Sequence, residues 1–399
     1  MKIVHLTTSD TGGAGIAAKQ LHLALLQGGH ESTFVSKVKL GPDFPSHIVT
    51  GDSFSDAEIR KYYLNNKKGG FDYFSFPYSD FKLESLDVIN SADIIHLHWI
   101  SDGFTDYKNV FSLPNKKFVW TLHDMNPFTG GCHHSDGCIK FTELCNYCPH
   151  LEGTVDEYIS FKIHNYKKEA LKNITDGNLK IVTPSKWLSD LSQKSACLKR
   201  FKHTVIPNII HLPGGEINRE EARLKLRLHK NDIALLFVAN GLDNPRKGLS
   251  ALISALQGIE KKDNLKIITV GGDEIKMEGL HNLNLGYVSD GMKIAETYSA
   301  ADAFILPSLA ENFPNTIVES LLCGTPVIAS AVGGIPEQIN KENGILVNSH
   351  SVEDWKNTLN NFINGKTIFN REQIKMEAMD KYDSGTILGN YLNLYNSFS

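Results

Sequence analysis

The sequence lacks any long apolar run. No stretch of about eighteen apolar residues occurs in its 399 residues, so no membrane-spanning helix is expected. The N-terminus, MKIVHL, enters a strand-like pattern at once, without the longer apolar core and cleavage site of a signal peptide. We therefore expect a cytoplasmic protein, in which thiols stay reduced.

The sequence also lacks a strong charge bias. The net charge is −4, and neither half carries the basic excess typical of nucleic-acid-binding domains, so no nucleic-acid partner is expected. A hydrophobic content of 41% and a charged content of 22% are ordinary for a globular enzyme. The chain length indicates two domains or more, each with enough residues for a core of its own.

Cysteine is scarce, yet four of the six cysteines lie within one short segment, residues 130–150. Cys145 and Cys148 have the spacing that places two thiolates on one metal ion, and Cys132 and Cys138 could complete a tetrahedral site. His133, His134 or His150 could replace one of the thiolates. A structural zinc site is one interpretation, while buried reduced thiols or a disulfide pair are the alternatives.

The first half opens with a strand–helix–strand pattern. Strands are predicted over residues 2–7 and 30–37, with a glycine-rich loop over 9–15 and a helix over 16–27. Gly13, Gly15 and Ala18 fit the dinucleotide-binding fingerprint, but the end of the second strand, Val35-Ser36-Lys37, lacks the acidic residue that would hold a ribose. A phosphate or sugar contact at Gly13 is therefore favoured over a nicotinamide or flavin site. Tight backbone packing is the simpler alternative.

Two later strands of this half, residues 92–99 and 117–123, each reach a histidine at the carboxyl end. Ligands gather at the carboxyl ends of strands in open α/β sheets, so His123 is a candidate ligand contact. For His98, structural hydrogen bonding is an equally good explanation. A helix over residues 154–174 carries lysines that could contact acidic lipid headgroups or simply face solvent: Lys162, Lys167, Lys168 and Lys172. Residues 41–85 are irregular, with one helix near 56–66.

The second half begins with a buried strand over residues 233–239, a polar loop and a helix over 249–259. Arg246 and Lys247 lie at this strand-to-helix turn, where two cations beside a helix N-terminus suit a diphosphate. A solvated basic turn is the alternative. Further strands are predicted over 180–185, 204–208, 265–270, 284–288 and 344–347, and further helices over 292–300 and 354–363.

The most informative stretch is residues 308–339. It follows a strand over residues 303–306, and it predicts a short helix from Pro314 to the residue before Gly324 and then a strand over 325–330. Glu311 precedes the helix and Glu319 lies inside it. The N–H groups of the first helical turn, at Asn315 and Thr316, could bind a phosphate between the two carboxylates. Ordinary solvated glutamates are the alternative.

This stretch resembles the signature of glycosyltransferase family 4. The matching residues are Pro307-Ser308, Glu311, Phe313-Pro314, Glu319, Gly324-Thr325-Pro326-Val327 and Gly333-Gly334-Ile335-Pro336-Glu337. The resemblance implies an α/β protein of the GT-B fold, with two Rossmann-like domains facing a central cleft and a C-terminal helix that crosses back to the first domain. We expect an acceptor-side domain over residues 1–207, a nucleotide-sugar-binding domain over 208–380 and the crossing helix over 381–399.

The resemblance also implies roles for single residues. Lys247 and Glu319 would bind the donor's diphosphate and ribose, and Glu311 and His123 would contact the transferred sugar in the catalytic site. The family's early arginine is replaced here by Leu242, so Arg246 is a substitute for it. No Asp-x-Asp pair occurs, so the expected catalysis needs no metal ion, and the family's mechanism retains the configuration of the sugar.

The cysteine segment resembles an insertion in bacterial exopolysaccharide and colanic-acid-type members of that family. This likeness implies a glycosyltransferase of surface polysaccharide biosynthesis, with a nucleotide-sugar donor, a lipid-linked oligosaccharide acceptor and peripheral contact with the inner face of the membrane. Two other functions stay open. One is a sugar-nucleotide epimerase with the same fold, and the other is a non-catalytic carbohydrate-binding protein.

Overall fold

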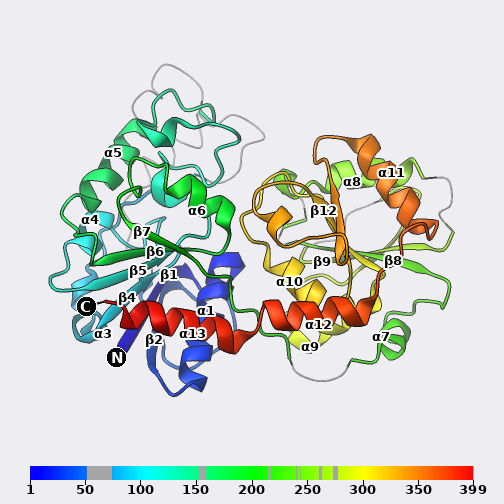
Figure 1. Cartoon of the computed structure of the whole chain (residues 1–399), viewed down its shortest axis with the longest axis horizontal. Coiled ribbons are helices and arrows are strands. Elements are labelled where there is room, and N and C mark those ends of the chain that lie inside the picture. Colours follow the sequence, from blue (N-terminus) through cyan, green and yellow to red (C-terminus); the bar gives the residue numbers. More distant parts are fainter. Residues whose placement is uncertain are drawn as a thin grey trace. The chain divides into compact units, whose positions relative to one another are not determined.

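The computed structural model describes residues 1–51, 74–151, 159–213, 217–239, 241–242, 244–259, 263–272 and 277–398 (Figure 1). The helix predicted near residues 56–66 lies outside these ranges. The chain divides into two compact units. The first contains Met1–Ile209 together with Ser384–Ser399, and the second contains Ile210–Asp383.

Seven described strands form the sheet of the first unit, and every pair of neighbours is parallel. Their order is β3-β2-β1-β4-β5-β6-β7, so the winding direction reverses between β1 and β4. In open α/β sheets, this reversal point is where ligands bind. The strands are β1 Lys2–Ser9, β2 Glu31–Val38, β3 His47–Val49, β4 Ile94–Leu97, β5 Lys117–Thr121, β6 Leu179–Thr183 and β7 Lys202–Val205.

Helices cover both faces of this sheet, which explains why the strands read as nearly continuous apolar runs. One face packs against α3 Asp87–Ser91, α4 Tyr107–Phe111, α5 Ile159–Leu171 and α6 Lys186–Ser192. The opposite face packs against α1 Gly12–Gln27 and α13 Ser384–Asn396, which lie side by side (Figure 1).

The helix α13 is held to the first unit by both apolar and polar contacts. Ile387 and Tyr391 pack with Ile3 and Val119 of the sheet. The hydroxyl of Tyr395 lies 2.7 Å from Nδ1 of His96, which is completely buried. A buried imidazole nitrogen needs a hydrogen-bond partner. This contact therefore fixes the position of α13 relative to β4, in addition to the apolar packing that buries the helix.

Six described strands form the parallel sheet of the second unit, in the order β10-β9-β8-β11-β12-β13. Its winding direction reverses between β8 and β11. The strands are β8 Ile233–Val238, β9 Leu265–Val270, β10 His281–Asn284, β11 Ala303–Leu306, β12 Val327–Ser330 and β13 Gly344–Val347.

The helices of the second unit also form two layers. One face of the sheet packs against α7 Arg219–Lys225, α9 Gly291–Ala300, α10 Asn315–Leu322 and α12 Arg371–Lys381. The other face packs against α8 Leu249–Gln257 and α11 Val352–Ile363. In the part of the chain that the structure describes, no helix is both long and apolar enough to cross a bilayer.

Four sequence predictions need correction. The strand predicted over residues 204–208 is wrong in position, because β7 is Lys202–Val205. The predicted loop over residues 9–15 is wrong in its second half, because α1 already begins at Gly12. The strand predicted over residues 284–288 is wrong in position, because β10 ends at Asn284. Lys167 does not belong to a solvated or lipid-facing surface, because its side chain is fully buried and its ammonium donates to the carbonyl oxygens of Asn126 and Thr129 at 2.5 and 3.2 Å.

Candidate active site

In the second unit, the candidate donor site begins where β8 and β11 end. The loop after β8 carries a 3-10 helix, Pro245–Lys247, and then Gly248, which has a left-handed φ of +71°. A Cβ atom on Gly248 would lie 2.0 Å from the carbonyl oxygen of Pro307. Leu309 N–H also donates to the Arg246 carbonyl at 2.8 Å. The two strand-end loops therefore pack backbone to backbone at the reversal point of the sheet.

Glu311 gathers the charged groups of these two loops. Its Oε1 atom accepts from the ammonium of Lys247 at 2.6 Å, from the hydroxyl of Ser308 at 2.9 Å and from the guanidinium of Arg246 at 3.3 Å. The residue is 9% exposed, so solvent screens these contacts little. Three donors on one carboxylate oxygen fix the positions of both cations.

The structure thus brings together three of the residues predicted from sequence: Arg246, Lys247 and Glu311. The guanidinium of Arg246 also donates to the Ala310 carbonyl at 2.8 Å. Two cations around one carboxylate leave a net positive charge, which suits an anionic ligand such as a diphosphate. Ser308 belongs to the sequence motif, but the motif does not predict the contact of its hydroxyl with Glu311. Its position three residues before Glu311, at a strand end, was the available signal.

The helix α10 supplies the next group of predicted residues. It begins at Asn315, one residue after the predicted start at Pro314, and Thr316 follows in its first turn. Proline has no side chain that could cap a helix, and the first N–H groups of a helix have no acceptor within it. The positive end of the helix dipole adds to the attraction for an anion.

Glu319 lies in the middle of α10 and contacts a residue that the sequence analysis missed. The hydroxyl of Tyr298, at the end of α9, donates to its Oε2 atom at 2.9 Å. Burial raises the pKa of Glu319, and the hydrogen bond from Tyr298 opposes that rise. Tyr298 therefore orients the carboxylate and leaves Oε1 as its second acceptor.

In the first unit, His123 and Asp124 follow β5, at the carboxyl edge of the sheet. Burial lowers the pKa of His123 to about 4, so the imidazole is neutral at pH 7, although Asp124 opposes the shift. Burial acts to raise the pKa of Asp124, but the imidazole of His133, 2.8 Å away, and a backbone hydrogen bond from Asn126 lower it overall. Asp124 is therefore ionised beside a neutral His123.

The glycines after β1 differ in their surroundings. A Cβ atom on Gly15 would lie 2.4 Å from the carbonyl oxygen of Ser9, so tight packing of α1 on β1 explains this glycine. A Cβ atom on Gly13 would meet nothing within 4 Å among the described residues. Gly13 lies in the first turn of α1, where a helix N-terminus could bind a phosphate or sugar oxygen, and its predicted donor contact stays a prediction.

The four clustered cysteines line a single pocket. Cys132, Cys138, Cys145 and Cys148 share it with His150 and Lys140. The ammonium of Lys140 donates to the carbonyls of Asn146 and Tyr147 at 3.0 and 2.8 Å, which joins two segments of the pocket's lining. All six cysteines of the chain are free thiols in the structure, so the disulfide alternative is not the state described here.

Burial keeps two of the pocket's thiols, those of Cys132 and Cys145, protonated. It raises the pKa of Cys145 to about 12 and that of Cys132 further still. Within the described residues, the only three metal-ligating side chains whose ligand atoms all lie within 4.8 Å of one another are His5, His96 and His98. The cysteine sulfurs share a pocket but do not converge to that distance. The donor set fits a zinc ion in chemistry, and closure around it requires the loop to contract.

The family model described as "Glycosyl transferases group 1" matches residues 232–364. These residues contain β8, the cations of the following loop, Glu311 and α10. The match covers the part of the chain in which the structure brings the predicted donor-site residues together.

Two curated relatives and two solved structures of one further protein illustrate the likeness. The putative colanic acid biosynthesis glycosyl transferase WcaC of Escherichia coli is 24% identical over 97% of both chains. The D-inositol 3-phosphate glycosyltransferase of Rhodococcus erythropolis is 30% identical over 39% of this chain and 40% of its own. The match to Anabaena HepE in complex with UDP covers 100% of both chains, with 18% identity and a TM-score of 0.66. The match to HepE in complex with UDP-glucose also covers 100% of both chains, with 16% identity and a TM-score of 0.65. The structural likeness identifies the fold as two Rossmann-like domains of the GT-B type.

Proposed function

We propose that this protein, whose residues 232–364 match the family model of group 1 glycosyltransferases, transfers a sugar from a nucleotide-diphosphate donor to a growing surface glycan with retention of configuration. The observation that carries the donor assignment is the cluster in which Lys247 and Arg246 both contact Glu311. A diphosphate is the chemical group that best matches two fixed cations beside the N-terminus of α10.

In this proposal each donor group has its own partner. Lys247 and Arg246 bind the diphosphate together with the N–H groups of Asn315 and Thr316. Glu319 accepts from the ribose hydroxyls, since Tyr298 holds its carboxylate in one orientation. Anabaena HepE, whose fold is similar, was solved with UDP and with UDP-glucose, which supports a donor of this class.

The chemical step then depends on stabilising the leaving diphosphate. Breaking the bond between the sugar and the diphosphate increases negative charge on the phosphate oxygens, which fixed cations and a helix dipole stabilise without reorganisation. The sequence holds no Asp-x-Asp pair to position a metal ion there. We propose that the acceptor hydroxyl attacks from the face that the diphosphate leaves, which retains the configuration, and that its proton passes to an oxygen of the leaving diphosphate. Glu311 and His123 contact the transferred sugar.

The acceptor in this proposal is a lipid-linked oligosaccharide, and the protein works at the inner face of the cell membrane through peripheral contact. The likeness to WcaC, named for colanic acid biosynthesis, over 97% of both chains supports a role in polysaccharide assembly.

A thermal-shift screen of nucleotide sugars tests the donor assignment. We expect one donor, and its nucleoside diphosphate alone, to raise the melting temperature, because a ligand at 100 times its Kd stabilises the folded state by about 2.7 kcal/mol. Free sugars should have little effect. If no nucleotide sugar or nucleoside diphosphate raises the melting temperature, the donor assignment is wrong.

Product analysis with the identified donor separates the alternatives. A glycosyltransferase converts the donor to a nucleoside diphosphate and extends an added acceptor. An epimerase would instead isomerise the donor with no acceptor present, and a carbohydrate-binding protein would leave it intact.

We also propose that the cysteine pocket holds a structural zinc ion, with Cys132, Cys138, Cys145 and Cys148 as its ligands and His150 as a possible substitute. The argument is chemical: four thiols around one pocket are a donor set that zinc prefers. Zinc binding would deprotonate thiols that burial otherwise keeps neutral.

Metal analysis of the purified protein should find about one zinc ion per chain. Replacing Cys145 by serine should remove the zinc and lower the melting temperature, whereas replacing Cys323, which lies in the second unit outside the pocket, should leave the zinc content unchanged. Metal-free protein with an unchanged melting temperature would contradict the zinc assignment.

A further inference from the structure

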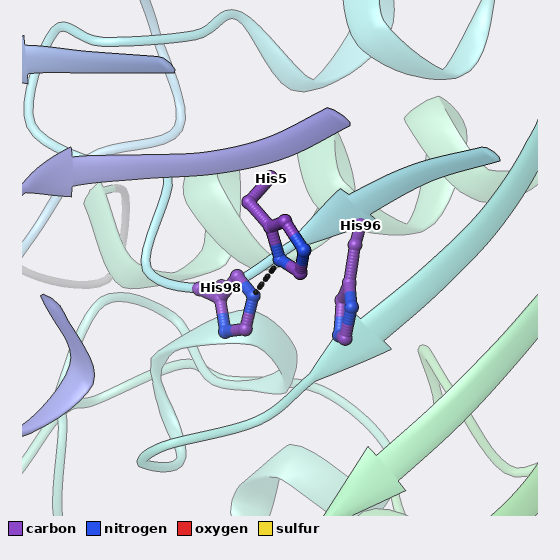
Figure 2. Close-up of side chains that lie close together, drawn as sticks. All are labelled: His5, His96 and His98. Carbon is purple, nitrogen blue, oxygen red and sulfur yellow. Dashed lines mark hydrogen bonds between the residues drawn. The ribbon is translucent and has the colours of Figure 1, made fainter. Parts of the chain in front are cut away.

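A row of imidazole rings runs along the sheet of the first unit toward the end of β5. His5 of β1 and His96 of β4 are partners in the parallel register, and His98 lies two residues beyond His96, so all three point to the same face (Figure 2). His123 follows β5. His5, His96 and His98 are at most 2% exposed.

The geometry of the three buried rings argues against a metal ion. Metal ligation needs the in-plane lone pairs of the rings to converge on one point, but the rings stack on one another. Their planes differ by 24–34° and their centroids lie 4.3–5.3 Å apart. Both nitrogens of His96 already contact hydroxyl groups, those of Tyr395 at 2.7 Å and Thr121 at 2.8 Å.

Unlike His96, the rings of His5, His98 and His123 form a continuous hydrogen-bonded chain. Nδ1 of His5 lies 3.1 Å from Nε2 of His98 (the dashed line in Figure 2), and Nδ1 of His98 lies 3.1 Å from Nε2 of His123. A neutral imidazole has one N–H and one lone pair. Burial lowers the pKa of His5, His98 and His123, so all three rings are neutral at pH 7. Every ring in the chain must therefore donate in the same direction.

The buried end of the chain fixes that direction. Among the described residues, Nε2 of His5 is buried and has no hydrogen-bond partner. If the chain ran inward from His123, this atom would carry an N–H without an acceptor, which is the rarer state in proteins. If the chain runs outward, it carries only an unused lone pair. The outward direction is therefore the favoured one.

We propose that His5 and His98 are positioning residues that fix the tautomer of His123. His5 donates through Nδ1 to Nε2 of His98, and His98 donates through Nδ1 to Nε2 of His123. His123 then carries its own proton on Nδ1, as a neutral hydrogen-bond donor. This inference rests on the proposed function in one respect: in a glycosyltransferase, His123 would donate through Nδ1 to an oxygen of the transferred sugar and would not act as a base at Nε2.

Nitrogen-15 NMR of the histidine side chains in the full-length protein tests this chain directly. We expect His123 to show a protonated Nδ1 and an unprotonated Nε2, and the same pattern for His98. A protonated Nε2 on His123 in the unmodified protein would overturn the proposed direction, whether or not any variant folds.

Substitutions test the dependence of His123 on its neighbours. His98→Leu should convert the single tautomer of His123 into a mixture. His98→Asn should restore it, because the amide nitrogen of asparagine lies close to where Nδ1 was and can still donate. His5→Phe, which keeps an aromatic ring at this position, should shift His98 and His123 together and serves if His98→Leu does not fold.

The control is His96→Leu, which removes an equally buried ring from the same stack but one whose hydrogen bonds lie outside the chain. It should leave the tautomer of His123 unchanged. A tautomer that is the same in His98→Leu and His5→Phe as in the unmodified protein would overturn the proposal. If no sugar is transferred but the tautomer pattern is found, the proposed function fails while the histidine chain stands.

Discussion

Replacing Lys247 by methionine should lower kcat/KM for sugar transfer by about 10²- to 10³-fold, the cost typical of removing one fixed group that stabilises transition-state charge. Methionine keeps the apolar part of the side chain and removes the ammonium. The protein should still fold, because Oε1 of Glu311 keeps its contacts with Ser308 and Arg246. Steady-state kinetics with the identified donor measure the effect.

The matched control is Lys341→Met in the same unit. The side chain of Lys341 is 91% exposed and pairs only loosely with Glu342, at 3.6 Å. Substitutions at such surface positions change free energies by about 0.5 kcal/mol or less. Equal activities of the two variants would mean that Lys247 does not contact the diphosphate, and the donor assignment would lose its main support.

Replacing Gly333 by alanine should destabilise the second unit and weaken donor binding together. Gly333 has a φ of +56°, and a Cβ atom there would lie 1.7 Å from the carbonyl oxygen of Glu311. Left-handed backbone and displacement of a packed loop together cost about 2–5 kcal/mol. The displaced loop carries the carboxylate that holds both cations. Thermal unfolding with and without the donor measures both effects.

Gly365→Ala separates these two causes. Gly365 has a similar φ of +70°, but a Cβ atom there would meet nothing within 4 Å among the described residues. Only the cost of placing alanine in a left-handed conformation, about 1–2 kcal/mol, should remain in this variant. The donor should stabilise it as much as it stabilises the unmodified protein. A Gly333→Ala variant as stable as Gly365→Ala would mean that the Glu311 loop moves aside at little cost.

The sequence predicts the buried elements best. The strand over residues 265–270 and the short helix between Pro314 and Gly324 are found as predicted, because a continuous apolar run and paired start and stop signals are local properties. The helix α12 was missed, because only Ile374 and Ala378 of its residues are buried and its pattern is therefore polar. The glycines from Gly12 onward led to a wrong loop prediction, because glycines usually indicate a loop but are tolerated at a helix N-terminus.

The donor-site residues were predictable as types but not as a cluster. Lys247 and Glu311 lie 64 residues apart, and only the adjacency of β8 and β11 in the sheet brings them together. The histidine chain is similar. The spacing of His96 and His98 predicts two imidazoles on one face of a strand, but their contact with His5 depends on the register of β1 with β4.

The position of α13 in the first unit has a consequence for protein synthesis. Tyr395 contacts His96 across 299 residues of sequence, and the whole second unit lies between them in the chain. Ribosomes therefore complete the second unit before they supply α13, one of the two helices that cover one face of the first sheet. Until then, apolar side chains on that face, Ile94 and Val119 among them, lack part of their cover. Nascent chains stalled before Ser384 should therefore be the aggregation-prone form of this protein.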